Sequence, residues 1–188
     1  MNNSSTLRYL FPHQETSKTA QGQVIWLYGL SGAGKSTIAH AAKNKLLSSN
    51  KKCFVLDGDD LRTGLNSDLG FSDHDRQENL RRAGEVARLL SYTTDIVICT
   101  FITPFNDIRG VIHGIMQGQS YKEVFIDTPL SECERRDVKG LYKKARQGLI
   151  KDFTGIDSPF EKPISPDLVI STREKSIDMC ADELLKLI

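Results

Sequence analysis

The chain has 188 residues, of which 39% are apolar and 26% are charged. This composition is that of an ordinary globular domain, and it excludes fibrous and disordered chains. The 25 basic and 24 acidic residues leave a net charge of +1, so we expect no broad basic surface for nucleic acid. We therefore predict a single domain whose anion sites are local.

The first 22 residues are polar and show no sustained hydrophobic period, so we expect an N-terminal arm there. Residues 23–188 are expected to fold as one domain. No apolar run approaches the roughly 18 residues of a membrane helix, and no signal pattern opens the chain. The four cysteines are far apart and form no CxxC pair, which favours free thiols. We expect a cytoplasmic protein that does not contact a membrane.

Short runs rich in β-branched residues predict five buried strands: residues 23–28, 52–57, 95–101, 123–127 and 167–171. Helical patterns separate them, and the clearest is Arg76–Leu90, whose apolar residues recur every three or four positions. Ser72 and Asp75 match a capping box before that helix. The alternation predicts an α/β fold, a three-layer α/β/α sandwich around a mainly parallel five-stranded sheet.

The stretch GLSGAGKST, residues 29–37, lies between the first predicted strand and a helical pattern. Gly29, Gly34, Lys35 and Ser36 satisfy the G-x-x-x-x-G-K-[ST] pattern of a phosphate-binding loop. Glycines let backbone N–H groups converge on one anion, and the helix N-terminus adds partial positive charge. We expect Lys35 to reach the β- and γ-phosphates of ATP, and Ser36 to be a ligand of Mg²⁺. The predicted fold is thus that of the P-loop nucleoside triphosphate hydrolases.

A phosphate-binding loop leaves switch GTPases, motor ATPases and small-molecule kinases open. The sequence has no N-K-x-D motif for guanine, which disfavours a GTPase. In a parallel sheet, the ends of the second and third strands share one edge with this loop. We expect that edge to bring Asp57, Asp59, Asp60 and Thr103 near the transferred phosphoryl group. Mg²⁺ makes carboxylates favourable there, and Asp59 is the candidate base for an attacking hydroxyl.

Basic and amide side chains follow these aspartates. Arg62 lies in the loop after the second strand, while Arg76 and Asn79 are three residues apart on one face of the capped helix. The planar fork of arginine suits an anionic group held in fixed geometry. These residues predict a site for a second anion beside the phosphate loop.

The blocks DGD, GLNSDLGFS, DRQENLRR, FITP, DTPLSECERRDVKGLYKKARQG and FTGIDSPFE occur in an order that closely resembles the adenylylsulfate kinases. The resemblance covers roughly residues 22–188 and implies a P-loop kinase domain with a mobile lid at about 139–163. It implies a phosphotransferase acting on an alcohol. With Mg²⁺, ATP phosphorylates the 3′-hydroxyl of adenosine 5′-phosphosulfate (APS) to give 3′-phosphoadenosine 5′-phosphosulfate, used in sulfate assimilation. It also implies a homodimer.

The resemblance implies roles for individual residues. The donor nucleotide is expected at Gly29, Leu30, Ser31, Gly32, Ala33, Gly34, Lys35, Ser36, Thr37 and Arg135. The candidates for catalysis are Lys35, Asp57 and Asp59. The acceptor is expected at Asp59, Arg62, Phe71, Arg76, Asn79, Ile102, Thr103, Lys139, Gly140, Leu141 and Phe153. Of these, the two arginines and the asparagine would hold the phosphosulfate and ribose, and the two phenylalanines would sandwich the adenine.

Two other functions stay open. One is a regulatory module that senses the sulfated nucleotide without catalysis; Lys35, Ser36 and Asp59 are all present, which disfavours it. The other is a kinase for a different small alcohol or nucleoside, which the acceptor blocks disfavour.

Overall fold

A computed structural model describes residues 21–188, so the expected N-terminal arm lies outside the described residues except for its last two. One sheet of five parallel strands has the order β2-β3-β1-β4-β5. The strands are β1 Gln23–Tyr28, β2 Cys53–Asp57, β3 Ile96–Phe101, β4 Tyr121–Asp127 and β5 Leu168–Ser171. The predicted sheet is confirmed. β4 begins before residue 123 because Tyr121 and Lys122 pair with Val24 and Ile25 of β1.

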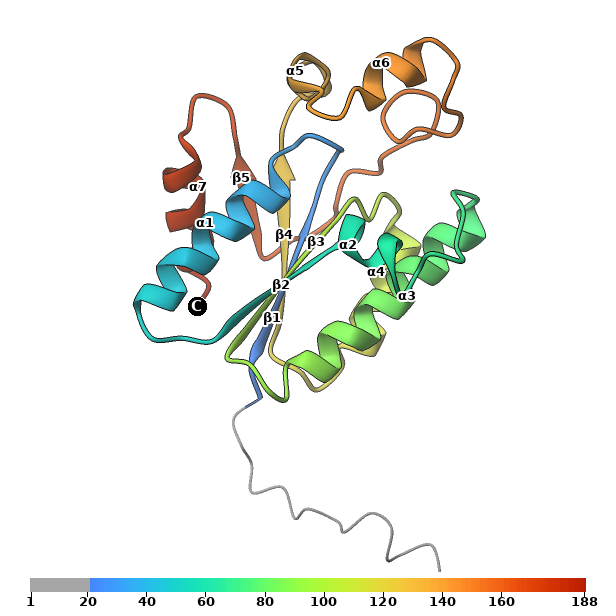
Figure 1. Ribbon diagram of the computed structural model, residues 1–188. Coiled ribbons are helices and arrows are strands. Elements are labelled where there is room, and N and C mark those ends of the chain that lie inside the picture. The colour runs from blue at the N-terminus through green and yellow to red at the C-terminus, as the bar shows by residue number, and fades with distance from the viewer. Residues whose placement is uncertain (1–20) are drawn as a thin grey trace, which may run out of the picture.

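Helices cover both faces of the sheet (Figure 1). They are α1 Lys35–Ser48, α2 Gly58–Thr63, α3 Asp73–Leu90, α4 Asn106–Ile115, α5 Leu130–Arg136, α6 Leu141–Arg146 and α7 Ile177–Leu185. α1 and α7 cover one face, and α3 and α4 cover the other, which gives the predicted three layers. The short helices α2, α5 and α6 lie at the edge where the strands end. Within residues 21–188, no helix is long and apolar enough to cross a bilayer.

β1 is the centre of the molecule. Ile25 and Leu27 pack in the core beneath α1 and α7, whereas Val24, Trp26 and Tyr28 pack in the core beneath α3 and α4. All five side chains are at most 1% exposed. A strand buried on both faces is rigid, so the phosphate loop that follows Tyr28 begins from a fixed point.

The start of α3 positions the turn that carries Phe71. Ser72 Oγ accepts a hydrogen bond from the Asp75 N–H at 3.1 Å, so the predicted cap forms and the helix begins at Asp73 rather than at Arg76. The Asp75 carboxylate does not return to Ser72, as a reciprocal box would require. It accepts from the Gly70 N–H at 3.1 Å and so fixes the preceding turn.

Candidate active site

The phosphate loop curls at the end of β1. Gly32 and Gly34 have φ angles of 71° and 103°, which residues with side chains rarely adopt. No side chain caps the start of α1. Its first N–H groups therefore stay available to an anion, together with the positive end of the helix dipole.

Lys35 is buried beside this loop. Its Nζ donates to the Gly29 carbonyl at 2.9 Å and to the Leu30 carbonyl at 2.8 Å. Burial lowers the pKa of Lys35 to about 8, because an ammonium ion loses its hydration there. A phosphate group is a stronger, charged acceptor than these carbonyls, so an anion bound in the loop would replace them as the partner of Lys35.

Ser36 and Asp57 form a pair of oxygen ligands at the same edge. Asp57 Oδ2 accepts from Ser36 Oγ at 2.5 Å and from Thr100 Oγ1 at 2.7 Å, while Oδ1 accepts from the Asp59 N–H at 2.9 Å. Burial opposes ionisation of Asp57, but these hydrogen bonds outweigh it and lower the pKa of the carboxyl group.

This oxygen pair fits Mg²⁺, a hard cation that takes one or two protein oxygens and completes its shell with phosphate oxygens and water. No cluster of three or more His, Cys, Asp or Glu side chains suited to a metal occurs in residues 21–188.

The start of the lid reaches both α2 and the phosphate loop. Lys139 forms an ion pair with Asp59, in the first turn of α2. Gly140, with a φ of 65°, then begins α6, so Leu141 is the first residue of that helix. Tyr142 Oη donates to the Ser31 carbonyl at 2.9 Å. The sequence did not single out Tyr142, because a tyrosine in a short amphipathic helix is as typical of core packing.

Arg62 and Phe71 stack on each other. The guanidinium carbon lies 4.5 Å from the centroid of the ring, and Arg62 Nη1 donates to the Gly70 carbonyl at 3.0 Å. Phe71 is 65% exposed, which is unusual for so large an apolar ring. An exposed ring backed by a cation on one face offers a stacking surface to a flat ligand.

Arg76 joins the segment of Phe71 to the lid. Its Nε donates to the Phe71 carbonyl at 2.8 Å, Nη2 to the Asp152 carbonyl at 2.5 Å and Nη1 to Thr154 Oγ1 at 3.1 Å. Phe153 lies between the last two residues and packs edge-on against Tyr142, with ring centroids 5.0 Å apart. The structure thus brings together the two segments that carry the expected adenine-stacking rings.

Asn79 is buried and is oriented by a second asparagine. Its Oδ1 accepts from Asn66 Nδ2 at 2.9 Å, and Asn66 is completely buried. The sequence did not identify Asn66, although it lies in the GLNSDLGFS block, since nothing local tells which polar residue of a turn points inward.

Thr103, expected near the transferred phosphoryl group, is buried. Its side chain is only 1% exposed, and its hydroxyl accepts from Trp26 Nε1 at 2.9 Å on the α3 and α4 face of the sheet. Thr103 is the second residue after β3 and has a φ of 45°, a left-handed conformation that is rare for a β-branched residue. The contact with the phosphate loop is made instead by the Ile102 carbonyl, which accepts from the Gly29 N–H at 3.3 Å.

Arg135 points into solvent and pairs with Glu132 at 2.7 Å. Its neighbour Arg136 approaches the phosphate loop, where Nη1 donates to the Ala33 carbonyl at 3.4 Å. A hollow of ≈ 350 Å³, here called the β5 hollow, is lined by Pro129, Ser131, Glu132, Arg136, Thr172, Arg173 and Glu174. The block ERRD contains both arginines, and only the direction of α5 decides which one faces this hollow.

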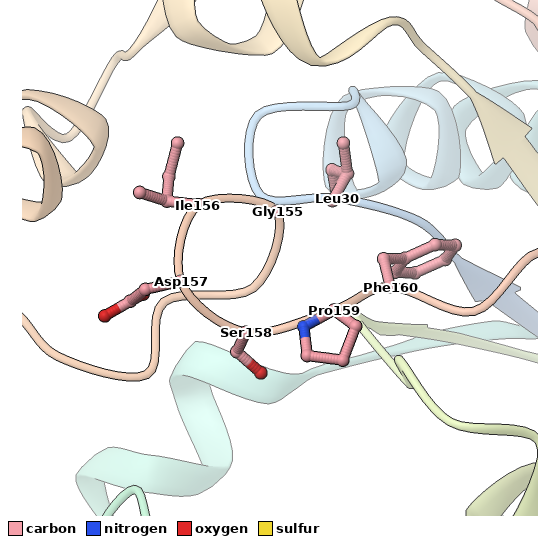
Figure 2. Close-up of a pocket in the computed structure, with 7 residues that line it drawn as sticks. All are labelled: Leu30, Gly155, Ile156, Asp157, Ser158, Pro159 and Phe160. Carbon is pink, nitrogen blue, oxygen red and sulfur yellow. The ribbon is translucent and has the colours of Figure 1, made fainter.

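A larger hollow of ≈ 570 Å³ lies where the lid meets the phosphate loop (Figure 2). This lid hollow is lined by Leu30, Gly155, Ile156, Asp157, Ser158, Pro159 and Phe160. Gly155 has a φ of 93°, and a Cβ atom there would lie 3.0 Å from the Leu30 side chain. Glycine therefore allows the lid to come this close to the phosphate loop.

Known proteins are similar to this chain in sequence and in structure. The family model described as Adenylylsulphate kinase matches residues 21–171. An adenylyl-sulfate kinase from Bacillus licheniformis is 49% identical over 168 residues, which are 89% of this chain and 85% of that protein. Another, from Bacillus pumilus, is 54% identical over 153 residues, 81% of this chain and 78% of that protein.

A solved structure extends the likeness to three dimensions. The Mycobacterium tuberculosis APS kinase CysC, in complex with AMPPNP and APS, aligns with a TM-score of 0.87 at 48% identity. The alignment covers 89% of this chain and 97% of that one. Because the family model and both relatives cover most of its length, the chain belongs to the adenylylsulfate kinase family.

Proposed function

We propose that this protein is an adenylylsulfate kinase, which transfers the γ-phosphoryl group of ATP to the 3′-hydroxyl of APS in the presence of Mg²⁺. The observation that carries the proposal is the convergence of Lys35, the Ser36 and Asp57 pair and Asp59 at one sheet edge. The product, 3′-phosphoadenosine 5′-phosphosulfate, is the activated sulfate of sulfate assimilation.

The donor nucleotide lies along the phosphate loop. Residues 29–37 hold the triphosphate, and the β5 hollow beside Arg136 and Thr172 takes the base, with Arg135 at its outer side. Ser36 and Asp57 would hold Mg²⁺, which when bound would neutralise part of the phosphate charge. Lys35 leaves its two loop carbonyls for the β- and γ-phosphate oxygens, where its charge stabilises the transferred group.

The acceptor lies on the other side of the loop, near the ends of β2 and β3. Phe71 and Phe153 stack on its adenine, Arg62, Arg76 and Asn79 bind its phosphosulfate and ribose, and Ile102, Lys139, Gly140 and Leu141 complete the site. Both arginines donate to backbone carbonyls in the free protein. An anionic group is a stronger acceptor than a carbonyl, so APS exchanges these bonds for its own.

Transfer needs one proton to move. The ribose 3′-oxygen attacks the γ-phosphorus, the bond from that phosphorus to the bridging oxygen of ADP breaks, and Asp59 receives the hydroxyl proton. Lys139 must first release the Asp59 carboxylate, which couples the base to the movement of the lid. Closure of the lid over both nucleotides excludes water, which would otherwise hydrolyse the γ-phosphoryl group.

We also propose that the enzyme works in the cytoplasm as a homodimer. The four cysteines are free and buried, as is typical of proteins from reducing compartments. The homodimer rests on the resemblance to the family.

The direct test is ADP release from purified protein with MgATP, comparing APS with AMP as acceptor. We expect turnover with APS and almost none with AMP, which lacks the sulfate that the arginines would bind. Turnover with neither, together with tight APS binding, would indicate a sensor module. Equal turnover with another alcohol would indicate a different small-molecule kinase.

We predict that Lys35 takes up a proton when ATP binds at alkaline pH. Its pKa of about 8 in the free protein is raised when phosphate oxygens surround the ammonium group. At about pH 8.5, binding should therefore take up as much as about 0.8 proton per site, and near pH 6.5 this group should take up almost none. Calorimetry in two buffers of different ionisation enthalpy measures the uptake. Lys35→Arg, which stays protonated, is the control and should abolish it; identical binding enthalpies for the wild type in both buffers at pH 8.5 would contradict the assignment.

A further inference from the structure

A buried arginine, Arg109 of α4, lies where the turn after β3 meets the end of the lid. It is 6% exposed. Its Nε donates to the Thr103 carbonyl at 3.1 Å, and its Nη1 donates to Asn106 Oδ1 at 2.7 Å. Its Nη2 donates to the carbonyls of Thr103, Pro104 and Glu161 at 2.9, 3.1 and 2.9 Å. Every acceptor is uncharged, and the guanidinium group links the turn at Thr103 and Pro104 to Glu161 at the end of the lid.

Two aromatic rings enclose the same guanidinium group. Its carbon lies 4.7 Å from the ring centroid of Tyr28 and 5.2 Å from that of Phe160. Phe125 stacks on both rings, at 5.9 Å from Tyr28 and 5.8 Å from Phe160. Arg109 is thereby bound to the last residue of β1 and to the last residue that lines the lid hollow.

The turn that Arg109 holds is strained. Thr103 is β-branched and has a φ of 45°, a conformation that persists only when its surroundings impose it. Trp26 holds its side chain and Arg109 holds its carbonyl. The preceding carbonyl, of Ile102, accepts from the first glycine of the phosphate loop. Arg109 itself makes no hydrogen bond to that loop; its hydrogen bonds go to the turn, to Asn106 and to Glu161.

The end of the lid is fixed at the same place. The Glu161 N–H donates to the Pro104 carbonyl at 2.9 Å, and Glu161 Oε2 accepts from the Asn106 N–H at 2.7 Å. Phe160 and Leu30 both line the lid hollow (Figure 2). Arg109 contacts Phe160 itself and Tyr28, two residues before Leu30.

We infer that Arg109 is a positioning residue for phosphoryl transfer, which sets the end of the lid at Phe160 and Glu161 relative to the phosphate loop. It acts through these segments, since all of its hydrogen bonds go to protein groups. The inference rests on the proposed function in that its kinetic readout uses APS. Since the lid closes on the acceptor, loss of Arg109 weakens the use of APS far more than the binding of ATP.

The test compares Arg109→Met and Arg109→Lys with the wild-type full-length chain. For Arg109→Met we expect the KM for APS to rise about tenfold or more, with the Kd for an ATP analogue changed less than about twofold. Arg109→Lys should recover part of the loss, because it keeps the charge but not the planar fork. Arg88→Met is the matched control, since Arg88 lies on the surface of α3 and pairs with Glu85. It should leave both constants unchanged.

Hydrogen exchange separates positioning from general destabilisation. Residues 153–161 should exchange at least about fivefold faster in Arg109→Met than in the wild type, while the strands should keep their protection. If that variant does not fold, Phe160→Leu, which keeps an apolar contact with Phe125 but removes one ring from the guanidinium group, should show the same changes more weakly.

An unchanged KM and unchanged exchange in a folded variant would overturn the inference, as would equal losses of ATP and APS binding. A wild-type protein that does not phosphorylate APS would overturn the proposed function instead. The exchange at residues 153–161 would still decide the role of Arg109.

Discussion

Replacing Lys35 with alanine is expected to reduce kcat by about a thousandfold or more. Residues 29–37 contain no second cation that could stabilise the negative charge of the γ-phosphoryl group during transfer. Rapid-quench measurement of ADP formation, with APS and MgATP both saturating, gives the value. Lys43→Ala, on the same helix α1 but away from the loop, should keep wild-type turnover.

The free protein should tolerate the change. Burial of the Lys35 ammonium group is unfavourable, as its lowered pKa indicates, so its removal should not lower the melting temperature greatly. ATP should, however, raise the melting temperature of Lys35→Ala less than that of the wild type. A variant that retains wild-type turnover would refute the phosphate-loop assignment.

Replacing Asp59 with asparagine is expected to lower kcat by about 10²- to 10⁴-fold, the usual contribution of a general base. Asparagine has the same shape but does not accept the hydroxyl proton. The substitution also breaks the ion pair with Lys139, so two controls are needed. Lys139→Met breaks that pair without removing the base, and Asp60→Asn alters the neighbouring exposed carboxylate.

The comparison of these three variants identifies the base. We expect Asp60→Asn to behave as the wild type, and Lys139→Met to lose much less turnover than Asp59→Asn. Equal losses of turnover in Lys139→Met and Asp59→Asn would mean that Asp59 contributes the ion pair rather than proton acceptance. Dissociation constants for APS, measured for each variant, separate binding from chemistry.

The sequence was sufficient for the sheet and the phosphate loop because both are local patterns. Alternating buried runs define strands, and the glycines of residues 29–34 lie between a strand and a helix. The carboxylates of Asp57 and Asp59 were also within reach of sequence analysis, since the ends of parallel strands meet at one edge. Each of these predictions depends on residues near one another in the chain.

The remainder of the site depends on contacts between distant residues. Arg76 was predicted to be a site residue, but its partners Asp152 and Thr154 are 76 and 78 positions away, and no local rule pairs them. The burial of Thr103 was not foreseen, because its hydroxyl contacts Trp26, 77 positions away, and its backbone adopts a left-handed conformation. Such contacts are fixed by packing of the whole domain, which a single sequence does not display.

The strand order has a stereochemical consequence. β1 lies between β3 and β4, so the phosphate loop that follows it lies between two sites. The β5 hollow lies on one side of the loop, beside β4 and β5. The proposed acceptor site lies on the other side, near the ends of β2 and β3. On the proposed placement, the two nucleotides meet a single phosphorus atom from opposite directions, without a protein-bound intermediate. A single in-line displacement inverts the configuration of the three non-bridging oxygens at that phosphorus. A phosphorus centre made chiral by isotopes would thus leave with the opposite handedness.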